Sequence, residues 1–347
     1  MSFKRLSADD FVVSADAVQS TAWSTNSPTL SEYYTSSLQK GGSSGVYYLS
    51  VFQSDSSQAG SAVQFDIAYG NVYGSGSTPF DNTYPQLTPS STIYGQYRSM
   101  ILEDENASFI FGDGNNTLTP DDFYVLSIDR ARYKESIYAG TLNIHLSSSG
   151  GNIVLTDNSN VTNVATFLGS SRVFQLVSGS NGTPISANGG YFPNSGSYGL
   201  VFPELGTILL NPRALQADIN LNTITGSSTP NGINNNLLFN SLDLSVSNAI
   251  SIASGSGFSL NSQETVSSDF IFCRAGNSEF NYSTNPSYIS GSTGALIFNQ
   301  FINNPQTYMT TVGMYNDSNE LIAVAKLSRP LVKDFTKEAL IRVKLDF

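Results

Sequence analysis

The sequence predicts an all-β protein with two domains of antiparallel β-sandwich type and few short helices. Apolar and polar residues alternate with a period of two in several short segments, which is the pattern of strands with one buried face. Serine, glycine, asparagine and threonine are abundant between these segments, and only 12% of the residues are charged. Amphipathic runs of good helix formers are scarce, so we expect sheets joined by turns.

The first predicted hairpin lies early in the chain. Residues 46–52 and 62–69 are β-prone runs, and residues 53–60 between them are turn formers. Residues 75–91 contain three prolines and are predicted to form a long loop, a kind of segment that often serves function or partner binding. Further strands are predicted at 93–102, 108–111, 123–129 and 140–146. Short helices are predicted at 7–20, 30–38 and 212–215.

The end of the chain predicts a second hairpin and a last strand. Residues 310–315 and 321–327 flank the turn-forming segment 316–319. Pro330 lacks a backbone N–H, so residues 328–331 are expected to leave the sheet. From 339 to 347 apolar residues again alternate with polar ones, which predicts the final strand.

A change in composition predicts the domain boundaries. Between about 142 and 264 the only basic residues are Arg172 and Arg213, and turns rich in glycine, serine and asparagine recur. We therefore expect an inserted β domain at 142–265. Residues 1–141 and 266–347 are expected to form one discontinuous β domain around it.

Charge is distributed unevenly along the chain. The net charge is -11, yet six of the 16 basic residues lie in the last 22 positions. Such polarity favours packing of this end against acidic surfaces, including those of a second copy. Alternatively, these charges only solvate an edge strand and prevent aggregation.

Six basic residues are the candidate interface residues. Three of them form the compact patch RARYK, which is either a salt-bridging partner surface or a solvated strand end. The other three belong to the basic C-terminal segment. The six are Arg130, Arg132, Lys134, Arg329, Arg342 and Lys344.

The sequence offers little catalytic chemistry. His145 is the only histidine and lies in a predicted strand without a companion metal ligand. The acidic clusters at 103–105, at 121–122 and at Asp317 with Glu320 are the only candidates for glycoside cleavage or a bound cation. Because each lies beside turn residues, we expect no catalytic, cofactor-binding or metal-binding residues and no enzyme activity.

Composition also argues against two classes of partner, nucleic acids and membranes. The sequence pI near 4.4 argues against general nucleic-acid binding, which depends on clustered lysine and arginine. No run of 18 apolar residues occurs, and no apolar leader follows the first residues, so we expect no membrane insertion.

Tyrosines in predicted turns suggest carbohydrate binding as an alternative function. Tyr191, Tyr198, Tyr282 and Tyr288 lie in segments rich in glycine, serine and asparagine, where their rings could stack on sugars. Ordinary packing at strand ends explains the same pattern. The alternative function is therefore a carbohydrate-binding tail fibre or adhesin module.

Three segments carry a resemblance to a known family. These are NELIAVAKLSRPL from Asn319, RAGNSEFNYSTNPSYISGSTG from Arg274 and FINNPQTY from Phe301. With them the chain resembles the baseplate wedge subunit, the one that forms dimers, of T-even-like contractile-tailed phages, and it is closest to the versions in marine cyanobacterial phages. The resemblance is strongest over residues 265–347.

The resemblance implies a structural protein of the virion. It implies a subunit of the tail baseplate, assembled in the host cytoplasm, that dimerises and bridges neighbouring wedge or tail proteins without a cofactor. Its motifs are structural, so no binding residue is carried over to this sequence.

Overall fold

The computed structural model describes residues 3–23, 26–30, 33–35, 48–55, 57–227, 229–242, 257–283 and 285–346. The protein is all-β, with 43% strand and 15% helix, and its ladders are antiparallel. The predicted fold class is confirmed. The chain divides into unit 1, residues 1–17 and 265–347, and unit 2, residues 18–264.

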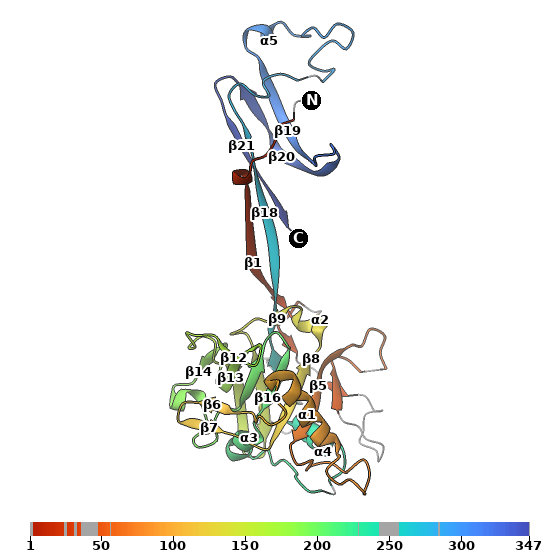
Figure 1. Cartoon of the computed structure of the whole chain (residues 1–347), viewed down its shortest axis with the longest axis vertical. Helices are drawn as coiled ribbons and strands as arrows, with labels where there is room; N and C mark the ends of the chain where they lie inside the picture. Colours follow the sequence, from red (N-terminus) through yellow and green to blue (C-terminus); the bar gives the residue numbers. More distant parts are fainter. Residues whose placement is uncertain are drawn as a thin grey trace. The chain divides into compact units, whose positions relative to one another are not determined.

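Unit 2 is built on one sheet of thirteen strands in the described part of the chain (Figure 1). Two of these strands, β12 (Thr166–Leu168) and β14 (Thr183–Pro184), branch from β13. The others follow the order β2 (Thr29–Leu30), β17 (Phe258–Ser259), β10 (Asn143–Ser148), β11 (Gly151–Asp157), β13 (Ser171–Ser180), β15 (Gly199–Phe202), β16 (Thr207–Leu210), β8 (Asp122–Ile128), β5 (Val63–Asn71), β4 (Tyr48–Phe52) and β3 (Tyr34–Thr35).

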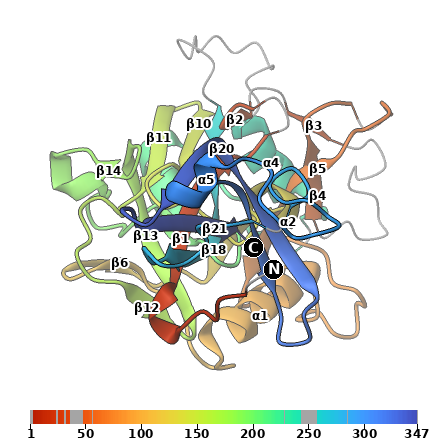
Figure 2. The ribbon, with the colours of Figure 1, turned by 90° about the horizontal axis from the view of Figure 1, so that it is seen from above.

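This sheet curls until strands from its two ends share one core. The rings of Phe65 in β5 and Phe258 in β17 lie 5.1 Å apart, although six strands separate them in the sheet order. Trp23 also packs on Phe258, with ring centroids 6.3 Å apart. Figure 2 shows the strands of both ends from above. The curl gives the layered, sandwich-like arrangement that the sequence predicts.

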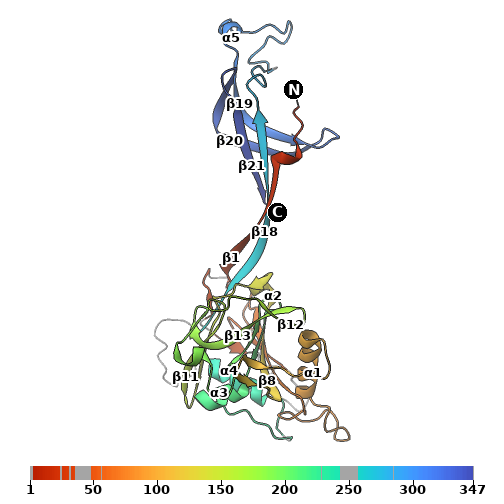
Figure 3. The same cartoon turned by 60° about the vertical axis from the view of Figure 1, so that its left-hand side comes forward.

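The opposite face of the central strands has its own core. The helix α1 (Pro89–Leu102) lies against this face (Figure 3) and contributes Tyr94, Tyr97 and Ile101. Tyr94 stacks on Phe123 of β8 at a centroid distance of 4.9 Å. Strands β5, β8, β15 and β16 are therefore buried on both faces, which explains the nearly continuous apolar sequence of β8, β15 and β16.

The remaining elements of unit 2 are short. Helices α3 and α4 add Leu215 and Leu238 to the core shared by the sheet ends. The elements are α2 (Arg130–Tyr133), α3 (Pro212–Ile219), α4 (Ile233–Leu242), the 3-10 helix η3 (Ala187–Gly190), β9 (Ser136–Ile137), and the hairpin of β6 (Phe111–Asp113) and β7 (Asn116–Leu118).

Unit 1 has much less core. Its sheet joins β1 (Phe11–Thr21), β18 (Asn261–Ala275) and β21 (Ala339–Asp346), and the chain passes between the units within β1 and within β18. The 3-10 helix η1 (Ala8–Asp10) precedes β1, and α5 (Gln300–Asn303) precedes the hairpin described next. The final strand is predicted correctly, although Phe347 lies outside the described residues.

The hairpin of β19 (Gln306–Tyr315) and β20 (Leu321–Asp334) confirms the predicted turn. Asn316 Oδ1 accepts hydrogen bonds from the backbone N–H groups of Ser318 and Glu320, and Asn319 adopts a left-handed conformation. The prediction that residues 328–331 leave the sheet is wrong, because β20 continues through Pro330 and Leu331 pairs with Met309, although residues 327–330 have no register partner in β19. The pairing is lost there because proline cannot donate to the ladder.

The predicted domain boundaries are wrong at one end. We expected 1–141 with 266–347 and an insert at 142–265, whereas the first boundary falls at residue 17. The reason is non-local pairing: β5 and β8, from the first part of the chain, lie in the same sheet as β16 and β15. The second boundary, at 264, falls close to the expected position.

Four secondary-structure predictions are also wrong, and one of them is the strand predicted at 108–111, where only Phe111 lies in a strand, β6. Residues 93–102 form part of α1 rather than a strand, because Thr88 caps the helix by accepting from the Ser91 N–H and Pro89 starts it. Residues 7–20 form η1 and β1 rather than a helix. The helix predicted at 212–215 is confirmed as α3. The helix predicted at 30–38 is wrong in its described part, where Leu30 ends β2 and Tyr34–Thr35 form β3, and residues 31, 32 and 36–38 lie outside the described residues.

Candidate functional site

The basic residues of the last strand form an exposed surface of unit 1. Arg342 and Lys344 lie on β21 opposite Phe272 and Phe270 of β18. The guanidinium carbon of Arg342 lies 5.4 Å from the centroid of the Phe270 ring, and the Lys344 ammonium lies 5.9 Å from it. These cation–π contacts hold two positive charges on one face of the ladder. Lys344 also pairs with Asp346 at 2.8 Å.

The hairpin of unit 1 exposes many apolar side chains. Ile322 is 68% exposed and Val324 is 58% exposed, both on β20. Tyr308 of β19 is 60% exposed. Arg329 lies exposed among the unpaired residues beside Pro330. A monomeric surface rarely gathers this much apolar area, so the hairpin is typical of a surface that another protein covers.

Lys333 of β20 behaves unlike the other basic residues of the tail. Its side chain is fully buried, and its ammonium donates to the carbonyl oxygens of Asn277 and Asp334 and to Asn281 Oδ1 at 2.7 to 3.1 Å. Three acceptors satisfy the three N–H donors of the group. Lys333 therefore fixes the loop after β18 and contributes no charge to the surface.

The basic patch at Arg130, Arg132 and Lys134 lies in unit 2, at the one-turn helix α2. Arg130 is exposed and lies over the ring of Tyr133 at 5.1 Å, Arg132 is half-buried, and Lys134 pairs with Glu264 at 2.7 Å. The six predicted interface residues are thus divided between the two units, and each group is on the surface of its own unit.

The candidate catalytic groups lie apart from one another. Asp122 is fully buried, where both its oxygens accept from Arg213 Nη2 at 2.8 Å, whereas its neighbour Asp121 is exposed. Tyr69 also donates to Asp122, and burial followed by this carboxylate raises the Tyr69 pKa far above its usual value. Burial lowers the pKa of His145 on β10. Asp122 is accordingly held in a structural ion pair.

The other acidic clusters are on the surface. Glu103, Asp104 and Glu105 follow the end of α1 and are exposed, as are Asp317 and Glu320 in the turn of the hairpin. Among the residues that the structure describes, no group of three or more histidine, cysteine or acidic side chains is placed to hold a metal ion. No helix in the same residues is long and apolar enough to cross a membrane.

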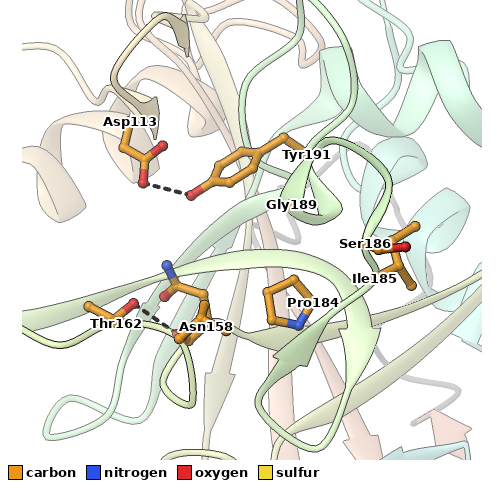
Figure 4. A pocket seen from close by; sticks show the side chains of 9 residues that line it. Asp113, Asn158, Thr162, Pro184, Ile185, Ser186, Gly189 and Tyr191 are labelled. Carbon is orange, nitrogen blue, oxygen red and sulfur yellow. Dashed lines mark hydrogen bonds between the residues drawn. The ribbon is translucent and has the colours of Figure 1, made fainter.

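Unit 2 contains two adjoining pockets that share Tyr191 and Ile185. Their volumes are about 490 and 570 Å³. Asp113 and Asn158 line the first pocket (Figure 4), and Asp218 lines the second. We call these two pockets, defined by these five residues, the Tyr191 groove.

Local backbone conformation places Tyr191 in the groove. Asn188, Gly189 and Gly190 precede it, and all three have left-handed φ values, from 51° to 80°. Asparagine and glycine are the residues that adopt this conformation readily. A side chain at Gly190 would also collide with the carbonyl oxygen of Ser178, so the sequence of this turn is suited to its shape.

The four tyrosines considered from the sequence have different environments. Tyr191 is half-buried at the groove, and Tyr282 is 69% exposed in unit 1. Tyr198 is a core residue at 3% exposure, and Tyr288 packs on Phe301 at 5.1 Å. Packing therefore explains two of the four. Asp113 and Asn158 were not predicted, because they are far from Tyr191 in sequence and neither belongs to a motif.

Comparisons with protein-family models, with curated proteins and with solved structures found no match.

Proposed function

We propose that this chain is a structural virion protein, a baseplate wedge subunit of a contractile phage tail that dimerises and bridges neighbouring wedge proteins. The observation that carries the proposal is the exposed apolar hairpin of unit 1. A subunit whose role is to be held by other chains needs such a surface, whereas an enzyme needs converging reactive groups. The resemblance of residues 265–347 to wedge subunits points to the same part of the chain.

A second copy is the occupant that we assign to the hairpin. Unit 1 carries nine basic and ten acidic residues, whereas unit 2 carries seven basic and seventeen acidic ones. The net charge is therefore -1 for unit 1 and -10 for unit 2. Two copies that meet through unit 1 bring nearly neutral surfaces together and avoid repulsion between two strongly acidic surfaces.

A charge placed on the hairpin tests this contact. Val324→Glu puts a carboxylate on a side chain that is already 58% exposed, so the monomer is expected to fold normally. Burying that carboxylate between two copies is costly, so we expect dissociation to rise by at least about tenfold. Sedimentation velocity at several protein concentrations measures this change.

The matched control is Val164→Glu, which alters a 74% exposed valine of unit 2. It should leave the dimer intact. A wild-type chain that sediments as a monomer at tens of micromolar, or equal effects of the two substitutions, would contradict the proposed contact.

The location in the virion needs a separate experiment. Gold-labelled antibodies against unit 2, applied to purified phage particles and viewed by electron microscopy, should mark the baseplate end of the tail. Labelling confined to fibres, or to no part of the particle, would reject the wedge assignment and leave the self-association result to stand by itself.

A further inference from the structure

The Tyr191 groove combines an aromatic ring with fixed polar groups. The Tyr191 hydroxyl donates to Asp113 Oδ2 at 2.9 Å, and this bond orients the ring across the pocket (Figure 4). Burial, followed by the Asp113 hydrogen bond, raises the Tyr191 pKa, so the hydroxyl stays protonated at neutral pH. The ring is half-buried, which leaves part of its surface open to the groove.

Asn158 supplies a donor without a partner. Its side chain is on the pocket lining although the residue is only 9% exposed. Its Oδ1 accepts from the Gln175 N–H at 3.0 Å, which identifies the other atom as the amide nitrogen. No hydrogen bond from that nitrogen is made to the residues that the structure describes, and Figure 4 shows it turned toward Tyr191. The nitrogen is therefore available to donate a hydrogen bond to an acceptor bound in the groove.

The charges around the groove limit the chemistry of a ligand. Asp113 and Asp218 both lie in the lining, and neither described pocket is lined by a lysine or an arginine. Anions such as phosphate would therefore meet repulsion without a counter-charge. A hydroxyl group suits these partners, because it donates to a carboxylate and accepts from an amide at the same time.

We infer that the Tyr191 groove binds a neutral oligosaccharide. One sugar ring lies with its C–H face on Tyr191, while its hydroxyls bind the amide nitrogen of Asn158 and the free oxygen of Asp113. The second pocket takes the next sugar, where Asp218 accepts from Tyr198 at 2.7 Å and offers its other oxygen. This activity is separate from self-association, because the groove lies entirely in unit 2.

The volumes favour an oligomer over a single sugar. Each pocket lies within the range of about 300–1,000 Å³ that is typical of ligand sites. The two share Ile185 and Tyr191, so one chain of linked sugars can occupy both. A monosaccharide would fill only one of them and leave the Asp218 side empty.

The experiment is binding of the full chain to an array of neutral hexaoses with maltose-, cellulose-, mannose- and chitin-type linkages, followed by calorimetric titration of the best one. Tyr191→Ala should weaken binding by at least about tenfold, because a central aromatic contact is lost. Tyr191→Phe keeps the ring and should stay within about threefold of wild type. The matched control Tyr84→Ala, at a 59% exposed tyrosine of unit 2, should leave binding unchanged.

A second variant keeps the test decisive if Tyr191→Ala does not fold. Ile185 is 49% exposed and lines both pockets, so Ile185→Arg fills the groove with little cost to the core. It should also abolish binding. Binding to none of the neutral hexaoses at millimolar concentration, binding only to an acidic control such as oligogalacturonate, or binding only to an unstructured peptide would each overturn the inference. Val324→Glu should not change sugar binding, which separates this result from the dimer test.

Discussion

Unit 2 and unit 1 differ in how many of their apolar side chains they bury. Unit 2 contains both core clusters of the described residues, and its central strands are covered on both faces. Unit 1 buries only four apolar side chains in the same part of the chain: Ile271, Ala275, Ala339 and Val343. The comparison teaches that unit 2 is stabilised by its own interior, whereas much of the apolar surface of unit 1 is available to another chain.

The largest expected effect comes from removing a ring in the unit 2 core. Phe123 contacts Tyr94 and Phe109, with ring centroids 4.9 and 5.1 Å apart. Phe123→Ala should lower the free energy of unfolding by about 3–5 kcal/mol, through lost burial and a cavity. Trp23 is the only tryptophan and is buried in unit 2, so its fluorescence during urea unfolding reports on this unit.

Phe335→Ala is the paired substitution in unit 1, where the phenylalanine is 55% exposed. It should change stability by less than about 0.5 kcal/mol. Similar losses for the two substitutions would show that unit 1 has a core comparable to that of unit 2, and the contrast would fail.

A smaller effect is expected from the charges that lie over Phe270. Reversing Arg342 and Lys344 to glutamate removes both cation–π contacts and adds repulsion with Asp346. The proposed dimer should dissociate about tenfold more readily without a change in circular dichroism, and added salt should reduce this difference. Sedimentation velocity at low and high salt measures it.

Replacing Arg130 and Arg132 with glutamate is the matched control, because these residues lie in unit 2. If self-association occurs through unit 1 alone, as proposed, their reversal leaves it unchanged. Equal weakening by both pairs would show that the contact depends on net charge and not on the face of β21.

The smallest effect is a pH dependence within unit 2. Burial raises the pKa of Asp66, although Ser50 donates to it. Its folded pKa then lies above the unfolded one, so its contribution to stability is present at low pH and is lost as the pH rises through the folded pKa. Asp66→Asn should therefore raise the thermal midpoint at pH 7 and leave it nearly unchanged at pH 3.

Asp81→Asn provides a control of opposite sign. The backbone N–H and hydroxyl of Thr83 donate to Asp81 and lower its pKa, so the charged form supports the fold above the unfolded pKa. This substitution should lower the midpoint slightly at pH 7. Equal signs for the two variants would contradict the assignment.

Features that depend on neighbouring residues were predictable from the sequence. The turn at Asn316 and the alternation of the last strand are local patterns, and both are confirmed. The helix α1 also had a local signal, the Thr88–Pro89 start with Tyr94, Tyr97 and Ile101 on one face, but its β-prone residues favoured a strand prediction.

Features that depend on distant pairing were not predictable. The domain boundary follows from the pairing of β8 with β16, about 80 residues apart in the chain. Lys333 is buried because its acceptors Asn277 and Asn281 come from 52 to 56 residues earlier. The groove likewise depends on the hydrogen bond between Tyr191 and Asp113, and no sequence motif predicts this contact. Composition cannot predict contacts between residues that are far apart in the sequence, because these contacts form only when the sheet has formed.

The interruption at Pro330 bears on the tendency of the hairpin to aggregate. A two-stranded ribbon with exposed apolar side chains can pair with further strands at its edges, and repeated addition produces a fibre. Residues 327–330 have no register partner in β19, and Pro330 has no backbone N–H to donate, so β20 is irregular at this point. Irregularities of this kind in an edge strand oppose the continuous addition of further strands.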